Sequence, residues 1–151
     1  MNSILWGLIA SLTPFLELRA GLPILVFGGI PVFWAFLLSV LFNLAVFPIT
    51  YLFLNYVHHH LRKFRYYENV FRHFEGKYKK KIEHRVGTKW EYLALFAFVV
   101  VPLPGTGAYS GSFIAWLFGL DKWKSFLAVS AGVVGAGILV ALAVVGAVRL
   151  F

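Results

Sequence analysis

The sequence predicts an all-α integral membrane protein, an inverted repeat in which each half has a re-entrant helical hairpin and a transmembrane helix. The 151-residue chain is 60% hydrophobic with a mean hydropathy of +0.80, which excludes an ordinary soluble domain and a disordered chain. Two apolar stretches, Leu8–Phe27 and Val100–Phe113, are each interrupted by prolines and polar residues. Ten of the 14 lysines and arginines lie between Arg62 and Lys89, and form a basic linker between two apolar halves.

The first half contains two short apolar segments and one long one. Ser3–Thr13 extends about 16 Å at 1.5 Å per residue, which is half of a hydrocarbon core of about 30 Å. Pro14 then removes a helix donor, and Leu18–Gly28 follows as the second short segment. The long segment, Pro31–Tyr56, extends about 39 Å and can cross the membrane with some tilt.

The basic linker is predicted to form an amphipathic cytoplasmic helix. Apolar residues recur at three- and four-residue steps between Leu61 and Trp90, and basic residues fill the other faces. Positive charge concentrated between membrane segments indicates the cytoplasmic side. It also favours anionic membrane lipids, and not nucleic acid, as the partner. The residues expected to face this lipid surface are Arg62, Lys63, Arg65, Arg72, Lys79, Lys80 and Lys81.

The second half repeats the order of short segment, break, short segment and long segment. Its elements are Tyr92–Val101, Pro102–Gly107, Ala108–Gly119 and Ser125–Phe151. An ungapped offset of 90 residues also aligns Pro14 with Pro104 and Gly29 with Gly119. We therefore expect a single membrane domain over 1–151, divided into repeat 1 (1–57), the linker (58–90) and repeat 2 (91–151).

The count of crossings predicts the topology. Each half crosses an odd number of times, whether its short segments form a re-entrant hairpin or cross fully, so the second half is inverted. With the linker in the cytoplasm, both termini face outward. Lys122 and Lys124 follow the second hairpin, and they lie on the cytoplasmic side only if that hairpin is re-entrant. Because irregular backbone at membrane depth needs protein or a water-filled cavity around it, we expect the two hairpin tips to meet near the midplane.

The first candidate site is the break in the first half. Glu17 and Arg19 are the only Asp, Glu, Lys or Arg residues among the first 61. Charged groups at membrane depth are costly and mark substrate or proton paths, and broken helices at matching places in two halves mark transporter binding sites. Glu17 can carry a proton, and Arg19 can hold an anion. A buried ion pair that holds the hairpin shut is the structural alternative.

The second candidate site is the break in the second half. It consists of Pro104, Gly105, Thr106, Gly107, Ala108, Tyr109 and Ser110. The glycines let the backbone approach a ligand, and the free N–H groups of the helix that starts near Ala108 can hold a phosphate or carboxylate. No lysine follows the glycines, so the segment is not a P-loop. A simple hairpin turn is the alternative.

Asn43, near the middle of the first long segment, is expected to bond across to a hairpin. No histidine lies at membrane depth and the only aspartate, Asp121, is at a predicted helix end, so neither a Ser–His pair nor an aspartate dyad is predicted. We expect no enzymatic activity and no catalytic residue. With no cysteine and no clustered ligands, we also expect no metal and no cofactor.

Two motifs resemble those of the small multidrug export protein family. They are Glu17–Pro23, ELRAGLP, and Pro102–Gly111, PLPGTGAYSG. That family is similar to the DedA superfamily of membrane proteins, and the resemblance covers nearly the whole chain. It implies two opposed re-entrant hairpins and the transport of lipid carriers or phospholipids, which is linked to the proton-motive force in DedA relatives. DedA chains usually carry further acidic and arginine residues at membrane depth, whereas this chain has only Glu17 and Arg19.

We therefore expect a transporter or flippase for an amphiphile with an anionic head group, a polyprenyl phosphate or a phospholipid. Arg19 and the amides of Ala108–Ser110 would hold the head group, and Glu17 would exchange a proton as the hairpins change access. Because four short membrane elements enclose little volume and the charge bias fixes one orientation, we expect a parallel homodimer or higher homo-oligomer. Its location would be the inner or plasma membrane of a prokaryotic cell.

Two alternatives remain open. One is an exporter of lipophilic cations, in which deprotonated Glu17 binds the substrate. The other is a non-transporting membrane-organising protein, whose basic linker binds anionic lipid or a partner.

Overall fold

The structure, a computed structural model, describes residues 2–13, 16–61, 89–101, 103 and 105–150. Within these ranges the chain forms helices and no strands, which confirms the predicted all-α class. The helices are α1 (Asn2–Leu12), α2 (Glu17–Phe27), α3 (Val32–Leu44), α4 (Val46–Leu61), α6 (Lys89–Val100), α7 (Ala108–Leu117) and α8 (Lys122–Leu150). Of the predicted linker (58–90), residues 62–88 lie outside this description, while 58–61 belong to α4 and 89–90 to α6.

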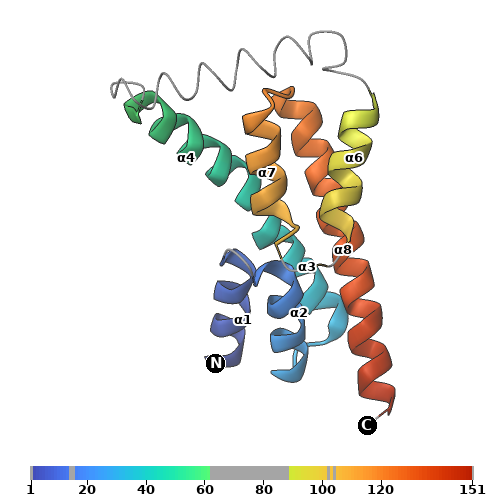
Figure 1. The fold of residues 1–151 in the computed structure, drawn as a ribbon. Coiled ribbons are helices and arrows are strands. Elements are labelled where there is room, and N and C mark those ends of the chain that lie inside the picture. Colours follow the sequence, from blue (N-terminus) through green and yellow to red (C-terminus); the bar gives the residue numbers. More distant parts are fainter. Residues whose placement is uncertain (1, 14–15, 62–88, 102, 104, 151) are drawn as a thin grey trace.

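Two pairs of short helices meet at mid-height of the molecule. Figure 1 shows α1 and α2 in the lower half and α6 and α7 in the upper half, with the connections within each pair facing each other. Both chain termini lie at the bottom of this view, and α4 ends and α6 begins at the top. The second helix of each pair packs on the long helix of the other half, α2 on α8 and α7 on α4. The two halves are therefore joined along their length.

Two helical stretches, Val32–His60 and Lys122–Val148, are long and apolar enough to cross a membrane. The first was predicted as one segment, Pro31–Tyr56, but the structure divides it at Ala45 into α3 and α4. Pro48 explains the division, because it has no N–H for the carbonyl four residues earlier and its ring crowds that carbonyl. In Figure 1, α4 leans away from α6 and α8 above this point, while it stays in contact with α7.

Two helix ends 90 residues apart share the same backbone geometry. At the end of α2, Gly29 has a φ of 94°, and the N–H after it donates to the Leu25 carbonyl at 3.1 Å. At the end of α7, Gly119 has a φ of 64°, and the N–H after it donates to the Ala115 carbonyl at 3.0 Å. Both ends are Schellman caps, in which glycine takes a left-handed conformation that other residues avoid. The sequence offset of 90 residues therefore corresponds to shared local structure at these two positions.

Small residues bring the helices close together. A Cβ placed on Gly21 of α2 would lie 2.9 Å from the Cβ of Ser11 on α1. One placed on Gly137 of α8 would lie 2.8 Å from the Phe36 ring on α3. The largest fully buried apolar side chains come from both halves of the chain and are Leu22, Leu25, Val46, Phe47, Val99 and Val129. The packed interior therefore lies between the halves, beside the meeting point of the short helices.

The close contact between α6 and α8 should make the protein sensitive to added bulk at Gly132. A Cβ on Gly132 would lie 2.7 Å from the Val99 Cβ and 3.1 Å from the Phe96 carbonyl oxygen, a main-chain atom that cannot rotate away. Gly132→Ala should therefore lower the free energy of unfolding by about 1–3 kcal/mol. Gly146→Ala is the control, because nothing lies within 4 Å of a Cβ there. Thermal unfolding in detergent should show a lower Tm for Gly132→Ala alone, and equal Tm values would contradict this close packing.

Candidate functional site

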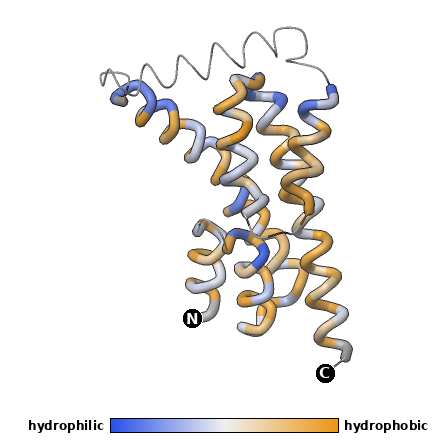
Figure 2. Tube along the Cα trace, in the orientation of Figure 1, coloured by the Kyte–Doolittle hydropathy of each residue, from blue (hydrophilic) through white to orange (hydrophobic). Residues whose placement is uncertain are grey.

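The charged residues of α2 lie where the two helix pairs meet. Figure 2 shows hydrophilic residues at the upper ends of α4, α6 and α8, and again at mid-height, where α2 begins. The Glu17 side chain is only 7% exposed, and Arg19 is half-buried. The first turn of α2 therefore carries both charges into the centre of an apolar molecule.

The Glu17 carboxylate binds the start of α7. Its Oε2 accepts a hydrogen bond from the Ala108 N–H at 3.3 Å, and its Oε1 accepts one from the Tyr109 N–H at 3.1 Å. The first N–H groups of a helix have no partner within the helix, and its N-terminal end favours negative charge. Gly107 precedes α7, and a Cβ there would overlap the carboxylate. The anion site predicted at the start of this helix therefore holds a carboxylate from the other half of the protein.

Glu17 also has an unusual backbone conformation. Its φ is +49°, and no other non-glycine residue in the described part of the chain has a positive φ. This left-handed conformation costs a residue with a side chain about 1–2 kcal/mol. Strain of this kind persists where the surroundings impose it, and it is frequent at functional sites. Each of the two hydrogen bonds to the carboxylate contributes about 1.5–3 kcal/mol, so contact with α7 is sufficient to hold Glu17 in this conformation.

Arg19 binds the end of α6. Its Nη2 donates to the Val101 carbonyl at 3.0 Å and to the Thr106 hydroxyl at 2.9 Å. The Thr106 hydroxyl also lies 2.7 Å from the Val101 carbonyl, to which it donates. The last carbonyls of a helix carry partial negative charge. The guanidinium therefore lies at the C-terminal end of α6 and the carboxylate at the N-terminal end of α7, and both charges complement the helix dipoles.

The predicted alternative of a Glu17–Arg19 ion pair is not what the structure contains. Glu17 and Arg19 each bind main-chain groups of the second half, at residues that the structure describes. Residues two apart in a helix do not face each other, which agrees with this arrangement. The two charges thus link the α1–α2 pair to the α6–α7 pair.

The break after α1 receives polar groups in the same way. The Tyr109 hydroxyl donates to the Leu12 carbonyl, and Asn43 Nδ2 donates to the Ser11 carbonyl at 3.1 Å. Asn43 is 1% exposed, and it makes the bond across to a hairpin that its position in the sequence predicts. The last carbonyls of α1 would otherwise lack partners. In each half, the main-chain groups at the interruption between the two short helices are therefore bound by side chains from another element.

The remaining predicted residues divide into two groups. Gly105 and Ser110 flank the network, and the Ser110 hydroxyl lies 3.3 Å from the Gly107 carbonyl, to which it donates. Outside the described residues lie Pro14, Pro104, Arg62, Lys63, Arg65, Arg72, Lys79, Lys80 and Lys81. Sequence reasoning missed the carbonyls of Ser11, Leu12 and Val101, because every residue has a carbonyl and no pattern distinguishes these.

A small cavity adjoins the carboxylate. Its volume is about 10 Å³, and Glu17, Arg19, Asn43 and Gly107 are among the residues that line it. This space suffices for about one water molecule, so the site in this conformation excludes a head group. Within the described residues, no three His, Asp or Glu side chains gather closely enough to hold a metal ion. The groups that the site brings together are an ionisable carboxylate, the free N–H groups at the start of α7 and a guanidinium.

Residues 17–139 match the family described as "Putative small multi-drug export protein". The match covers most of the chain and includes Glu17, Arg19 and the whole second break. Together with the two apolar spans, it identifies a membrane protein. No curated protein and no solved structure matches the chain.

Proposed function

This chain belongs to the small multi-drug export family, and from that premise we propose that it carries amphiphiles with an anionic head group across the membrane. In this proposal α1–α2 and α6–α7 are re-entrant hairpins of an inverted repeat, which enter the membrane from opposite sides and separate at Glu17 during transport. An 11-residue helix such as α1 or α2 extends about 16 Å, half the hydrocarbon core. The opposed helix pairs in Figure 1 and the matched caps at Gly29 and Gly119 support this arrangement.

The contact between Glu17 and α7 is the observation that carries the proposal. A carboxylate already occupies an anion site, so a substrate phosphate or carboxylate would make the same hydrogen bonds to Ala108 and Tyr109. Protonation of Glu17 removes its charge and weakens these bonds. The α7 amides and Arg19 would then face a gap between the hairpins and accept the head group of the substrate. Loss of the proton would return Glu17 to the amides and release the head group.

Export of lipophilic cations is a second candidate, and the family description favours it. A cation would have to draw Glu17 away from the α7 amides and bind it beside the positive charge of Arg19. The geometry therefore supports an anionic head group better. A non-transporting organiser does not need an ionisable group on the α7 amides, so the contact of Glu17 supports it least.

The cellular setting is part of the proposal. We place the protein in the inner or plasma membrane of a prokaryotic cell, with residues 58–90 in the cytoplasm on anionic lipids and both termini outside. We expect a parallel homodimer or higher homo-oligomer that binds no nucleic acid and catalyses no reaction. The relation to the DedA superfamily also remains a prediction.

Transport in proteoliposomes tests the proposal. The purified protein should move a fluorescent phospholipid or polyprenyl phosphate when a pH gradient is imposed, and Glu17→Gln should lose about tenfold or more of this rate, as expected for a lost charge-assisted interaction. Glu91→Gln makes the same chemical change in the first turn of α6 and should transport at the native rate.

Other outcomes would replace this proposal. Equal, gradient-independent movement in native protein and Glu17→Gln would mean scrambling with a structural role for Glu17. Movement of a lipophilic cation such as tetraphenylphosphonium without movement of the anionic lipids would establish the second candidate. If folded protein moved neither compound, the interpretation as a non-transporting membrane-organising protein would be favoured.

A further inference from the structure

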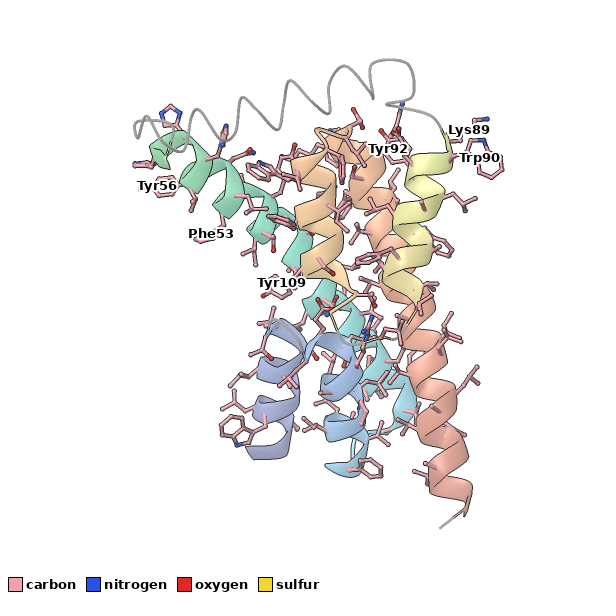
Figure 3. All side chains as sticks on the ribbon, in the orientation of Figure 1. Phe53, Tyr56, Lys89, Trp90, Tyr92 and Tyr109 are labelled. Atoms are coloured by element: carbon pink, nitrogen blue, oxygen red, sulfur yellow. The ribbon has the colours of Figure 1, made fainter. Side chains whose placement is uncertain are left out.

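A groove of about 440 Å³ lies between α4 and α7, next to the Glu17 contact. Ile49, Thr50 and Phe53 line it from α4, and Tyr109, Ser110 and Phe113 line it from α7. Figure 3 shows Phe53 and Tyr109 on these two helices. The volume lies within the range of small-molecule sites, about 300–1,000 Å³, and most of the lining is apolar, as in such sites. We infer that the apolar part of the transported amphiphile lies in this groove, with its polar end near Thr50 and Ser110.

The groove results from the break in the long helix. Above Ala45, α4 leans away from α6 and α8. Farther along α4, Asn55 Oδ1 accepts a hydrogen bond from Trp116 Nε1 of α7 at 2.8 Å. The residues that line the groove on α4 fall between the break and this bond. The space is therefore bounded at both ends along α4.

Tyr109 connects the groove to the Glu17 contact. The Tyr109 side chain lines the groove, while its main-chain N–H donates to Glu17 and its hydroxyl donates to the Leu12 carbonyl. A molecule in the groove therefore contacts the residue through which the two hairpins are joined. An apolar body in the groove and an anionic group at the start of α7 would be adjacent parts of one compound.

Thr50 supplies an independent observation. Its hydroxyl oxygen is buried and has no hydrogen-bond partner among the described residues, although a helical threonine can bond to the carbonyl four residues earlier. A buried hydroxyl without a partner is unfavourable. Thr50 lines the groove together with Ser110, so a rotation of its side chain about the Cα–Cβ bond would let an oxygen atom of a bound amphiphile give this hydroxyl a partner. A lipid chain alone would not.

This inference rests on the proposed function, and photolabelling tests it directly. The probe is a single-chain alkyl phosphate with a diazirine in its chain, incubated with the native protein in liposomes. We expect labels on residues 49–54 and 109–113, displaced by an excess of unlabelled alkyl phosphate. Equal labelling of the groove and of Leu142 and Val148, which are exposed on α8, would show contact with bulk lipid only and overturn the inference.

Two variants of α4 complete the test. Thr50→Trp fills the groove and should lower both displaceable labelling and transport by about tenfold, as expected when added bulk cannot be accommodated. Leu52→Trp is the control, because Leu52 is on the same helix, is 61% exposed and does not line the groove. Thr50→Val replaces the hydroxyl with a methyl group of similar size. It should raise the half-saturating probe concentration several-fold. Thermal unfolding of each variant confirms that it is folded.

The possible failures are distinguishable. Displaceable labelling of the groove without any transport would support the groove and refute the proposed function. Transport that Thr50→Trp and Leu52→Trp affect equally would refute the groove and leave the proposed function in place.

Discussion

Gly107→Ala should abolish gradient-driven transport and lower the free energy of unfolding by about 3 kcal/mol. The Cβ would overlap the Glu17 carboxylate and displace it from α7. The N–H groups of Ala108 and Tyr109 would lose a charged acceptor, and a bond to a charged group is worth about 1.5–3 kcal/mol. The backbone itself would tolerate alanine, because Gly107 is extended, with a φ of 160° and a ψ of −163°. Transport in proteoliposomes and chemical unfolding in detergent would measure the two effects.

A double-mutant cycle supplies the control for Gly107→Ala. In a Glu17→Ala background no carboxylate remains to be displaced, so adding Gly107→Ala should cost less than about 0.5 kcal/mol. Strong non-additivity would identify Gly107 as the position that leaves room for the carboxylate. Additive losses would mean that Gly107 acts through another contact, and the link between the hairpins would need revision.

The order of the helices could be read from the sequence because apolar segments between prolines and glycines have few other solutions in a membrane. Short segments such as Ser3–Thr13 and Ala108–Gly119 correspond closely to α1 and α7. The break of the long helix at Ala45 was not predicted. Pro48 is visible in the sequence, but whether a proline merely bends a helix or divides it depends on the packing around it.

The residues of the candidate site could also be read from the sequence, but their partners could not. Charges in an apolar stretch single out Glu17 and Arg19, and glycines before a helix single out Gly107. Their contacts join residues about 90 positions apart, which no local pattern encodes. The sequence placed a substrate anion on the α7 amides, whereas the structure places Glu17 there. In the proposed function, a substrate anion could bind at this position only after Glu17 had left it.

In the proposed function, Glu17 and the substrate anion compete for the α7 amides, so the site has two alternative states. When Glu17 occupies the amides, its left-handed backbone is strained and the adjoining cavity is too small for a head group. In the proposed transport cycle Glu17 leaves the amides, which would relieve this strain and let the cavity enlarge. The net binding free energy of a substrate at the vacated amides would therefore be the difference between its own contacts and those that Glu17 gives up. The carboxylate and the substrate anion exclude each other, so in the proposed function a proton on Glu17 and an anion on the amides are bound at the same time, which is the condition for their coupled transport.

Arg19→Gln should lower transport of an anionic amphiphile by about tenfold to a hundredfold with little change in stability. The Val101 carbonyl would retain the Thr106 hydroxyl at 2.7 Å and the Leu103 N–H at 2.8 Å, so the loss of Arg19 leaves no carbonyl there without a partner. What disappears is the positive charge beside the α7 amides. A charge-assisted contact worth about 1.5–3 kcal/mol corresponds to the expected loss in rate at subsaturating substrate.

Arg19→Lys is the matched control, because lysine keeps the charge but not the planar donor group. It should retain more transport than Arg19→Gln, while the unfolding temperatures of both variants stay close to that of the native protein. The direction of the change with Arg19→Gln also reports the charge of the substrate. An anion loses an attractive group and moves more slowly, whereas a cation loses a repulsive one and moves faster. Measuring both kinds of compound with the same two variants would therefore decide between the two candidate functions at a single side chain.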